Sequence, residues 1–171
     1  MAAAALLAAM LMVAAGSSRT VAHTAAPTAF LGVFIDNDNA AYEPTSAAEL
    51  ARAAHVEVQF KSLLETSGEY KFVPVTAAMR SRIAAGQALG RCAGCEAAYG
   101  RELGAARVAW IEVQKISNLI LNMNVYILDA TSGKSLVVHS VDIRGNTDES
   151  WSRSLTYLVK NYVLSKAGAS G

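Results

Sequence analysis

The sequence predicts an α/β (α+β) fold built on a single mixed sheet of about five strands, with helices packed mainly on one face. In the first half, short runs rich in β-branched and aromatic residues alternate with segments of helical spacing. In the second half, three such runs follow one another with only tight turns between them. A chain of 171 residues is long enough for one domain and short for two. The predicted order is β-α-β-α-β-β-β-α.

The first predicted strand is "FLGVFIDN", residues 30–37, which ends in a polar turn. A helix follows, because Ser46 and Glu49 have the spacing of a capping box, in which hydroxyl and carboxylate each bind a free backbone N–H. The helix is predicted to end at Gly68, and its apolar positions have roughly helical spacing: Leu50, Ala54, Val58, Leu63 and Leu64.

A short second strand, "YKFVPV", comes next, and Pro74 indicates that it lies at a sheet edge or ends there. Residues 76–90 are predicted to be a helix or a helical loop. A further helix is predicted from about Cys95 to Leu103, with Gly104 as its C-terminal stop.

Three consecutive strands are predicted in the second half. Residues 107–116 and 119–129 are joined by a tight hairpin at Ser117-Asn118. The turn "ATSGK" leads into the third strand, "SLVVHSVDIRG".

The last helix starts in "NTDESW", where Asn146 stands three residues before Glu149 in a box-like pattern. Its buried stripe is predicted to be Leu155, Leu158, Val159 and Val163. Residues 165–171 are expected to form a frayed tail, so the single domain is predicted to span residues 30–164.

Residues 1–26 are predicted to be a signal peptide or N-terminal leader. Residues 1–16 form an uncharged apolar run, short for a membrane span and typical of a signal peptide, although no Lys or Arg precedes it. The alternative is an Ala-rich helix that stays attached as an anchor. No cysteine follows the run directly, so a lipid anchor is not predicted. We expect a periplasmic or secreted protein without a stable membrane span after cleavage.

Charge and motifs exclude several classes of function. The chain has 15 Lys and Arg against 14 Asp and Glu, which does not provide the basic surplus that a nucleic-acid footprint needs. The nucleophile-elbow, zinc-protease, P-loop and dinucleotide-binding motifs are absent from the sequence. We therefore predict no catalytic residues, no cofactor and no metal site.

Three blocks of the second half, "CAGCEAAYGRELGA", "VQKISNLILNMNVYILDATSGK" and "SVDIRGNTDESW", resemble an uncharacterised family of small secreted bacterial proteins. The resemblance covers roughly residues 30–164 and implies no catalytic residues, because the family is a domain of unknown function. The strand order and "ELGA-x-x-VAWIEVQKI" also resemble the amino-terminal domain of TolB and the α/β domain of curli-secretion proteins, which are periplasmic interaction modules. No propeller sequence follows here, unlike in TolB.

The two cysteines, Cys92 and Cys95, have three possible roles. In an exported protein a nearby pair is most often a structural disulfide, which is the favoured interpretation. A C-x-x-C pair at a helix N-terminus can also be redox-active, although a thioredoxin-like site would follow a core strand. A zinc site would need two more ligands, and the three histidines, His23, His55 and His139, are scattered along the chain.

Alternation along the three consecutive strands separates one dry face from one polar face. The dry face is predicted to hold Ala109, Ile111, Val113, Leu119, Leu121, Met123, Val125, Ile127, Val141 and Ile143. The polar face has aromatic and amide side chains and few lysines, a composition that suits a partner surface as well as a solvated sheet face. The candidate partner surface consists of Trp110, Glu112, Gln114, Asn122, Asn124, Tyr126 and Asp142.

These observations favour a non-enzymatic interaction module of the periplasm or extracellular space, with envelope proteins as partners and no nucleic-acid partner. The alternative is a thiol-disulfide oxidoreductase that uses Cys92 and Cys95.

Overall fold

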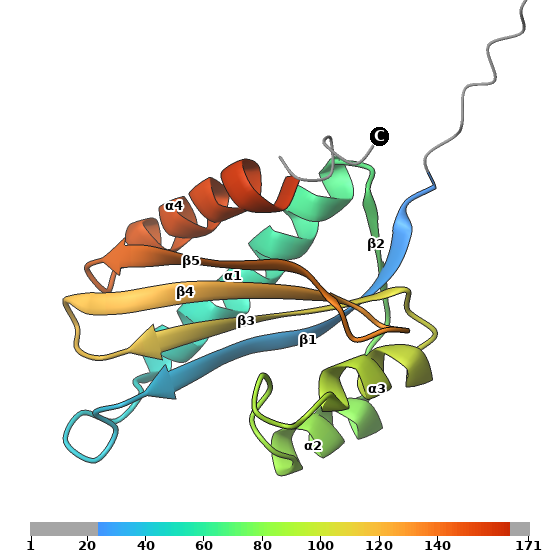
Figure 1. The fold of residues 1–171 in the computed structure, drawn as a ribbon. Helices are drawn as coiled ribbons and strands as arrows, with labels where there is room; N and C mark the ends of the chain where they lie inside the picture. The colour runs from blue at the N-terminus through green and yellow to red at the C-terminus, as the bar shows by residue number, and fades with distance from the viewer. Residues whose placement is uncertain (1–23, 165–171) are drawn as a thin grey trace, which may run out of the picture.

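The computed structural model describes residues 24–164, which form one five-stranded sheet with helices on both sides (Figure 1). The strand order is β2-β1-β3-β4-β5, with β5 at one edge and β2 at the other. β1 pairs in parallel with β2 and β3, whereas β3, β4 and β5 form an antiparallel meander. The predicted mixed sheet and fold class are confirmed. The elements are β1 (Ala26–Asn37), α1 (Ala47–Thr66), β2 (Tyr70–Val73), α2 (Ala77–Ala85), α3 (Cys95–Glu102), β3 (Arg107–Lys115), β4 (Ile120–Asp129), β5 (Ser135–Arg144), α4 (Asp148–Leu158) and the π-helical turn η1 (Val159–Val163).

The main core lies between the sheet and the two long helices, α1 and α4. β4 contributes every second side chain, as alternation predicts. The predicted stripe of the last helix is also buried, so both inward faces are confirmed. Leu119 is the exception on the dry face, because it lies in the hairpin turn and is exposed. The side chains of β4, α4 and η1 that are buried in this core are Leu121, Met123, Val125, Ile127, Trp151, Leu155, Leu158, Val159 and Val163.

Helix α1 buries only the last part of the predicted stripe: Leu64 is buried and Leu63 packs against the core, whereas the earlier positions face outward. Leu50 and Val58 are 59% and 67% exposed, and Ala54 is exposed as well. The chain offers two parallel stripes at helical spacing, and the inward one contains Phe60, whose ring lies 5.1 Å from that of Phe30. Burial of this aromatic pair decides the phase of the helix, because aromatic rings contribute the largest apolar areas. The inward residues of α1 are Glu49, Ala53, Val56, Phe60 and Leu64.

A second, smaller core covers one end of the opposite sheet face. The region of residues 76–90, predicted as a helix or helical loop, contains the helix α2, and α3 follows it after a short loop. Gly100 lets α3 approach the sheet, because a Cβ at this position would lie 3.0 Å from the Cβ of Ala130 and 3.1 Å from that of Val108. The second face is therefore closed at this end, so the predicted polar face is open only in part.

β1 begins at Ala26, four residues before the predicted strand, and its first residues pair with β2. The sequence "APTA" has little strand propensity, so its pairing depends on the neighbouring strands. Gly32 has a φ of 133°, which favours glycine, and the pairing of β1 with β3 shifts between Phe30 and Val33. This bulge keeps both Phe30 and Val33 on the α1 side of the sheet.

The N-terminal cap of α4 differs from the prediction by one residue. Thr147 is the N-cap, and it forms a capping box with Ser150 rather than a pair between Asn146 and Glu149. The side chain of Asn146 is instead hydrogen-bonded to Glu49 and Trp151.

Across residues 24–164, no helix has the length and apolar character that a membrane span requires. The predicted leader, up to residue 23, and the predicted tail lie outside the described residues.

Candidate functional site

Six of the seven residues of the predicted partner surface lie together on the uncovered part of the sheet. Strand register places Glu112 beside Asn124, and Asn122 between Gln114 and Asp142. Asp142 is exposed, and the other five, including Tyr126, are half-buried. We call this group, without Trp110, the open face: Glu112, Gln114, Asn122, Asn124, Tyr126 and Asp142.

Trp110 does not belong to the open face, because it is only 3% exposed. Its ring stacks on Tyr126, with centroids 4.7 Å apart, and it packs in the second core with Leu89. A Cβ on Gly90 would lie 3.9 Å from the Trp110 ring. The loop after α2 therefore covers Trp110, which makes it a core residue. The alternation of side chains within β3 cannot predict that a loop from another part of the chain buries Trp110.

Hydrogen bonds fix several side chains of the open face. The Gln114 amide donates to Asp38 (3.2 Å). Beside the open face, Arg91 in the loop before α3 donates to Asp36 (2.8 Å). With its amide nitrogen turned towards β5, Asn122 donates to Asp142 (2.9 Å). The surface is thus preorganised, and polar atoms are held at defined positions before any partner arrives.

Glu112 is a carboxylate of the open face whose ionised form is disfavoured by its surroundings. Burial raises its pKa, and the negative charges of Asp36 and Asp38 raise it further, against the opposing effect of Arg91. A cationic group placed over Glu112 would relieve this repulsion. The open face is therefore suited to a partner that presents arginine or lysine.

Exposed aliphatic side chains flank the open face on both sides. Val138 pairs with Tyr126 across the strands and is 52% exposed, and Ile120 at the other end is 55% exposed. A groove of about 490 Å³ between β4 and β5 includes Ile120, Asn122, Asp142 and Arg144 in its lining. Polar groups at fixed positions next to exposed apolar side chains are the composition of a protein interface.

A buried ionic network on the opposite side of the sheet was missed by the sequence interpretation. Lys115 continues the inward alternation of β3 and is 1% exposed, and Glu49 of the capping box is equally buried. The Lys115 Nζ lies 2.8 Å from Glu49 and 3.2 Å from Glu43. A charged residue at an inward strand position is the signal that could have identified this network.

Further hydrogen bonds complete the network around Glu49. Asn146 donates to Glu49 (2.6 Å) and accepts from the indole of Trp151 (3.0 Å), while the Ser46 backbone donates to the other carboxylate oxygen (2.7 Å). Burial alone would raise the pKa of Glu49, but the bonds from Lys115, Ser46 and Asn146 lower it from 4.5 to about 2. The network ties the start of α1 to β3 and to the start of α4.

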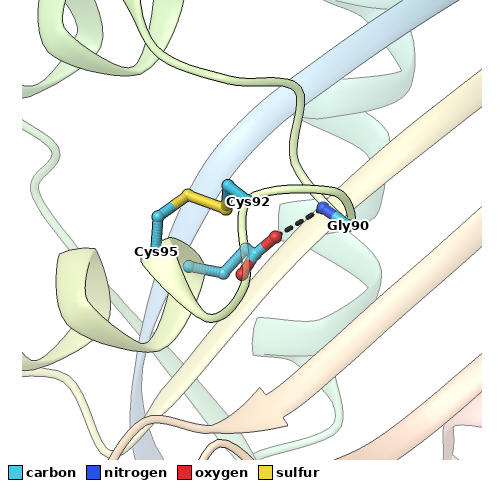
Figure 2. Close-up of a disulfide and its surroundings, with 4 residues drawn as sticks. Gly90, Cys92 and Cys95 are labelled. Atoms are coloured by element: carbon cyan, nitrogen blue, oxygen red, sulfur yellow. Dashed lines mark hydrogen bonds between the residues drawn. A yellow bond between two sulfur atoms is a disulfide. The ribbon is translucent and has the colours of Figure 1, made fainter.

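The predicted disulfide between Cys92 and Cys95 is present, with an S–S distance of 2.00 Å (Figure 2). Cys95 is the first residue of α3, and both cysteines are half-buried. The adjacent Glu96 is 3% exposed and accepts a hydrogen bond from the backbone N–H of Gly90. The disulfide and this bond together fix the loop that covers Trp110.

We predict that replacing both cysteines with serine lowers the free energy of unfolding by about 2 kcal/mol, because the bond closes a very short loop and constrains the unfolded chain little. Urea unfolding of the wild type and of Cys92→Ser/Cys95→Ser measures the difference. The reduction potential of the wild type is the matching readout for redox activity. A structural disulfide should have a strongly negative reduction potential and be inert towards insulin, whereas rapid exchange with glutathione would favour the oxidoreductase alternative.

A model of the family described as "Protein of unknown function (DUF2380)" matches residues 26–163. Among curated proteins, none matches the chain significantly. The chain is similar in structure to the LpoB C-terminal domain from Salmonella enterica, with 12% sequence identity, a TM-score of 0.50, and coverage of 73% of this chain and 87% of that chain.

Lipoprotein GNA1162 from Neisseria meningitidis is similar over 85% of this chain and 98% of its own, with 17% identity and a TM-score of 0.49. TolB from Acinetobacter baumannii is similar over 80% of this chain and 28% of its own, with 13% identity and a TM-score of 0.44. Identities this low concern the fold alone.

Proposed function

The chain belongs to the DUF2380 family of proteins of unknown function, and we propose that it is a non-enzymatic interaction module that joins a complex of the cell envelope through its open face. The observation that carries the proposal is Glu112, a half-buried carboxylate on the β3 side of the open face that is crowded by Asp36 and Asp38. We infer that the partner is a protein whose contact surface presents a cationic side chain to Glu112.

The proposed location in the periplasm or extracellular space is supported by two features of the chain. Its first residues have the composition of a signal peptide. Its disulfide is of a kind that persists in oxidising compartments.

Charge complementarity explains why this surface would recognise a partner selectively. The negative charges of Asp36 and Asp38 make the ionised Glu112 carboxylate unfavourable when it has no cationic partner. A cation of the partner protein placed over Glu112 would compensate this charge and so favour binding. A surface with acidic groups in this position would meet like charge and be rejected. The exposed Val138 on β5 and Ile120 at the start of β4 would add apolar contact area elsewhere on the same sheet face.

The test is photo-cross-linking in cells with a reactive amino acid at position 124. We expect a specific adduct from this position and none from Ala54, an exposed residue of α1 on the other side of the sheet. Glu112→Gln should reduce the adduct, and after mass spectrometry has identified the partner it should weaken the measured affinity about tenfold or more. Glu65→Gln, an exposed change on α1, is the matched control. Equal adducts from positions 124 and 54, or no effect of Glu112→Gln, would contradict the proposal.

A further inference from the structure

A cluster of metal-ligating side chains lies at the start of α3, away from the centre of the open face. One ligand atom each from Cys92, Cys95 and Glu96 lies within 4.8 Å of the other two, and within residues 24–164 this is the group of His, Cys, Asp and Glu close enough to hold an ion. Sulfur and carboxylate oxygen are both ligands of zinc. The sequence interpretation rejected zinc because two more ligands were needed beside the cysteines, and Glu96 supplies one of them.

We propose that, when the disulfide is reduced, Cys92, Cys95 and Glu96 bind one zinc ion, with a water molecule in the fourth position. This inference is independent of the open face and of its partner. In this proposal, the segment of Cys92 to Glu96 has a metal-bound state in addition to the disulfide-bonded state.

The backbone around the cysteines is compatible with this coordination. The two Cα atoms are 5.5 Å apart, and the left-handed conformations of Ala93 (φ 52°) and Gly94 (φ 99°) turn the chain so that both side chains point to the same side. Tetrahedral coordination at Zn–S distances of about 2.3 Å requires the sulfur atoms to be about 3.8 Å apart. The sulfurs are 2.00 Å apart in the disulfide, so after reduction the two side chains would have to rotate about their Cα–Cβ bonds to reach this separation.

Glu96 is already positioned as a third ligand. A buried carboxylate is unfavourable unless it is paired, and this one is 3% exposed with one oxygen bonded to the Gly90 N–H (Figure 2). A carboxylate has two oxygens, so one can keep the bond to Gly90 while the other binds the ion. That bond would orient the ligand, as outer hydrogen bonds do in metal sites.

The charge of the loaded site also suits its position. Two thiolates and one carboxylate carry three negative charges, and Zn²⁺ leaves a net charge of −1 at the N-terminus of α3. The free backbone N–H groups of a helix N-terminus stabilise negative charge.

The chemistry balances with an external dithiol or phosphine as reductant. Reduction adds two electrons and two protons to the Cys92–Cys95 bond and leaves the reductant oxidised. Zinc then forms two Zn–S bonds, and the two thiol protons pass to solvent. The disulfide and the metal are mutually exclusive, so oxidation of the thiols releases the ion.

The full chain, reduced with a water-soluble phosphine, is titrated with Co²⁺ and then with Zn²⁺. We expect one Co²⁺ per chain, with a sulfur-to-cobalt charge-transfer band and the visible bands of a tetrahedral ion, and loss of both when Zn²⁺ is added. Glu96→Gln keeps an acceptor for the Gly90 N–H and should weaken Zn²⁺ binding by about tenfold or more. Glu96→His should restore it, because imidazole is a zinc ligand.

Two controls separate the site from unspecific binding. The oxidised protein should give no cobalt bands, and Glu102→Gln, an exposed change in the same helix, should bind like the wild type. Circular dichroism establishes that each variant is folded. Wild-type affinity in folded Glu96→Gln, or equal binding by the oxidised protein, would overturn the proposal, and neither outcome would affect the cross-linking test of the open face.

Discussion

Lys115→Met is expected to lower the free energy of unfolding by about 3–5 kcal/mol, because it removes one partner of a buried ion pair and leaves the buried Glu49 carboxylate without that cation. Glu49 is as buried as Lys115 and cannot turn to water when the lysine is lost. Glu43 is more exposed, with 37% of its side chain accessible, and can be solvated again. The loss should therefore come mainly from Glu49.

The effect is measured by urea unfolding of the wild type, of both single variants and of Lys115→Met/Glu49→Gln. Glutamine at position 49 removes the charge, and its single carbonyl oxygen can keep one of the two hydrogen bonds that Ser46 and Asn146 donate to the separate carboxylate oxygens. The double variant should be more stable than the sum of the single changes predicts, by about 1–3 kcal/mol. A loss of less than about 1 kcal/mol in Lys115→Met would mean that the pair behaves like a surface salt bridge.

The dependence of stability on pH tests the same ion pair in these variants. The folded-state pKa of Glu49 is about 2, below its ordinary value of 4.5, so its ionised form stabilises the fold above pH 4.5. This contribution is lost as the pH falls from about 4.5 towards 2. Lys115→Met removes a hydrogen bond that lowers the Glu49 pKa, so the variant should lose less further stability than the wild type in that range.

Trp110→Ala is expected to destabilise the domain by about 3–5 kcal/mol, because it empties a large volume in the second core. The ring is covered by the loop after α2 and stacks on Tyr126, so neighbouring groups cannot fill the space without moving the loop. Thermal and urea unfolding measure the loss.

Two matched variants separate the effect of removing the Trp110 ring from the effect of removing its N–H group and from that of any substitution on this sheet face. Within the described part of the chain, the buried indole nitrogen of Trp110 has no hydrogen-bond partner. Trp110→Phe therefore removes an unsatisfied donor and should retain most of the stability. Val138→Ala changes an exposed residue in the same cross-strand row and should have an effect within about 0.5 kcal/mol. If Trp110→Ala were as mild as Val138→Ala, the ring would be accessible in solution and would join the open face.

The sequence could predict those features that depend on neighbours in the chain. Alternation in β4 placed Met123 and Val125 inward and Asn122 and Asn124 outward, because successive strand residues point to opposite faces. The capping box at Ser46 and the stripe of α4 follow from spacing over a few residues. The disulfide is equally local, with two residues between its cysteines.

The features that the sequence did not predict depend on distant segments. Lys115 contacts Glu43 at a separation of 72 residues, so its inward strand position can indicate a buried charge but not the partner of that charge. Trp110 is covered by a loop whose own sequence is rich in glycine and alanine. The phase of α1 was decided by Phe30 on a strand across the core. In each case, packing between elements selected one of several arrangements that local patterns allow equally.

The position of β5 at the sheet edge has a consequence for handling the protein at high concentration. Residues 135–141, "SLVVHSV", contain no Asp, Glu, Lys, Arg or Pro, and they form most of this strand. The other edge, β2, has four residues and is followed by Pro74, which limits further pairing. An uncharged β-branched segment at an edge is a template for pairing with the same segment of another molecule. Partial unfolding that loosens α4 from β5 would therefore favour aggregation that begins at β5, while β2 would resist it.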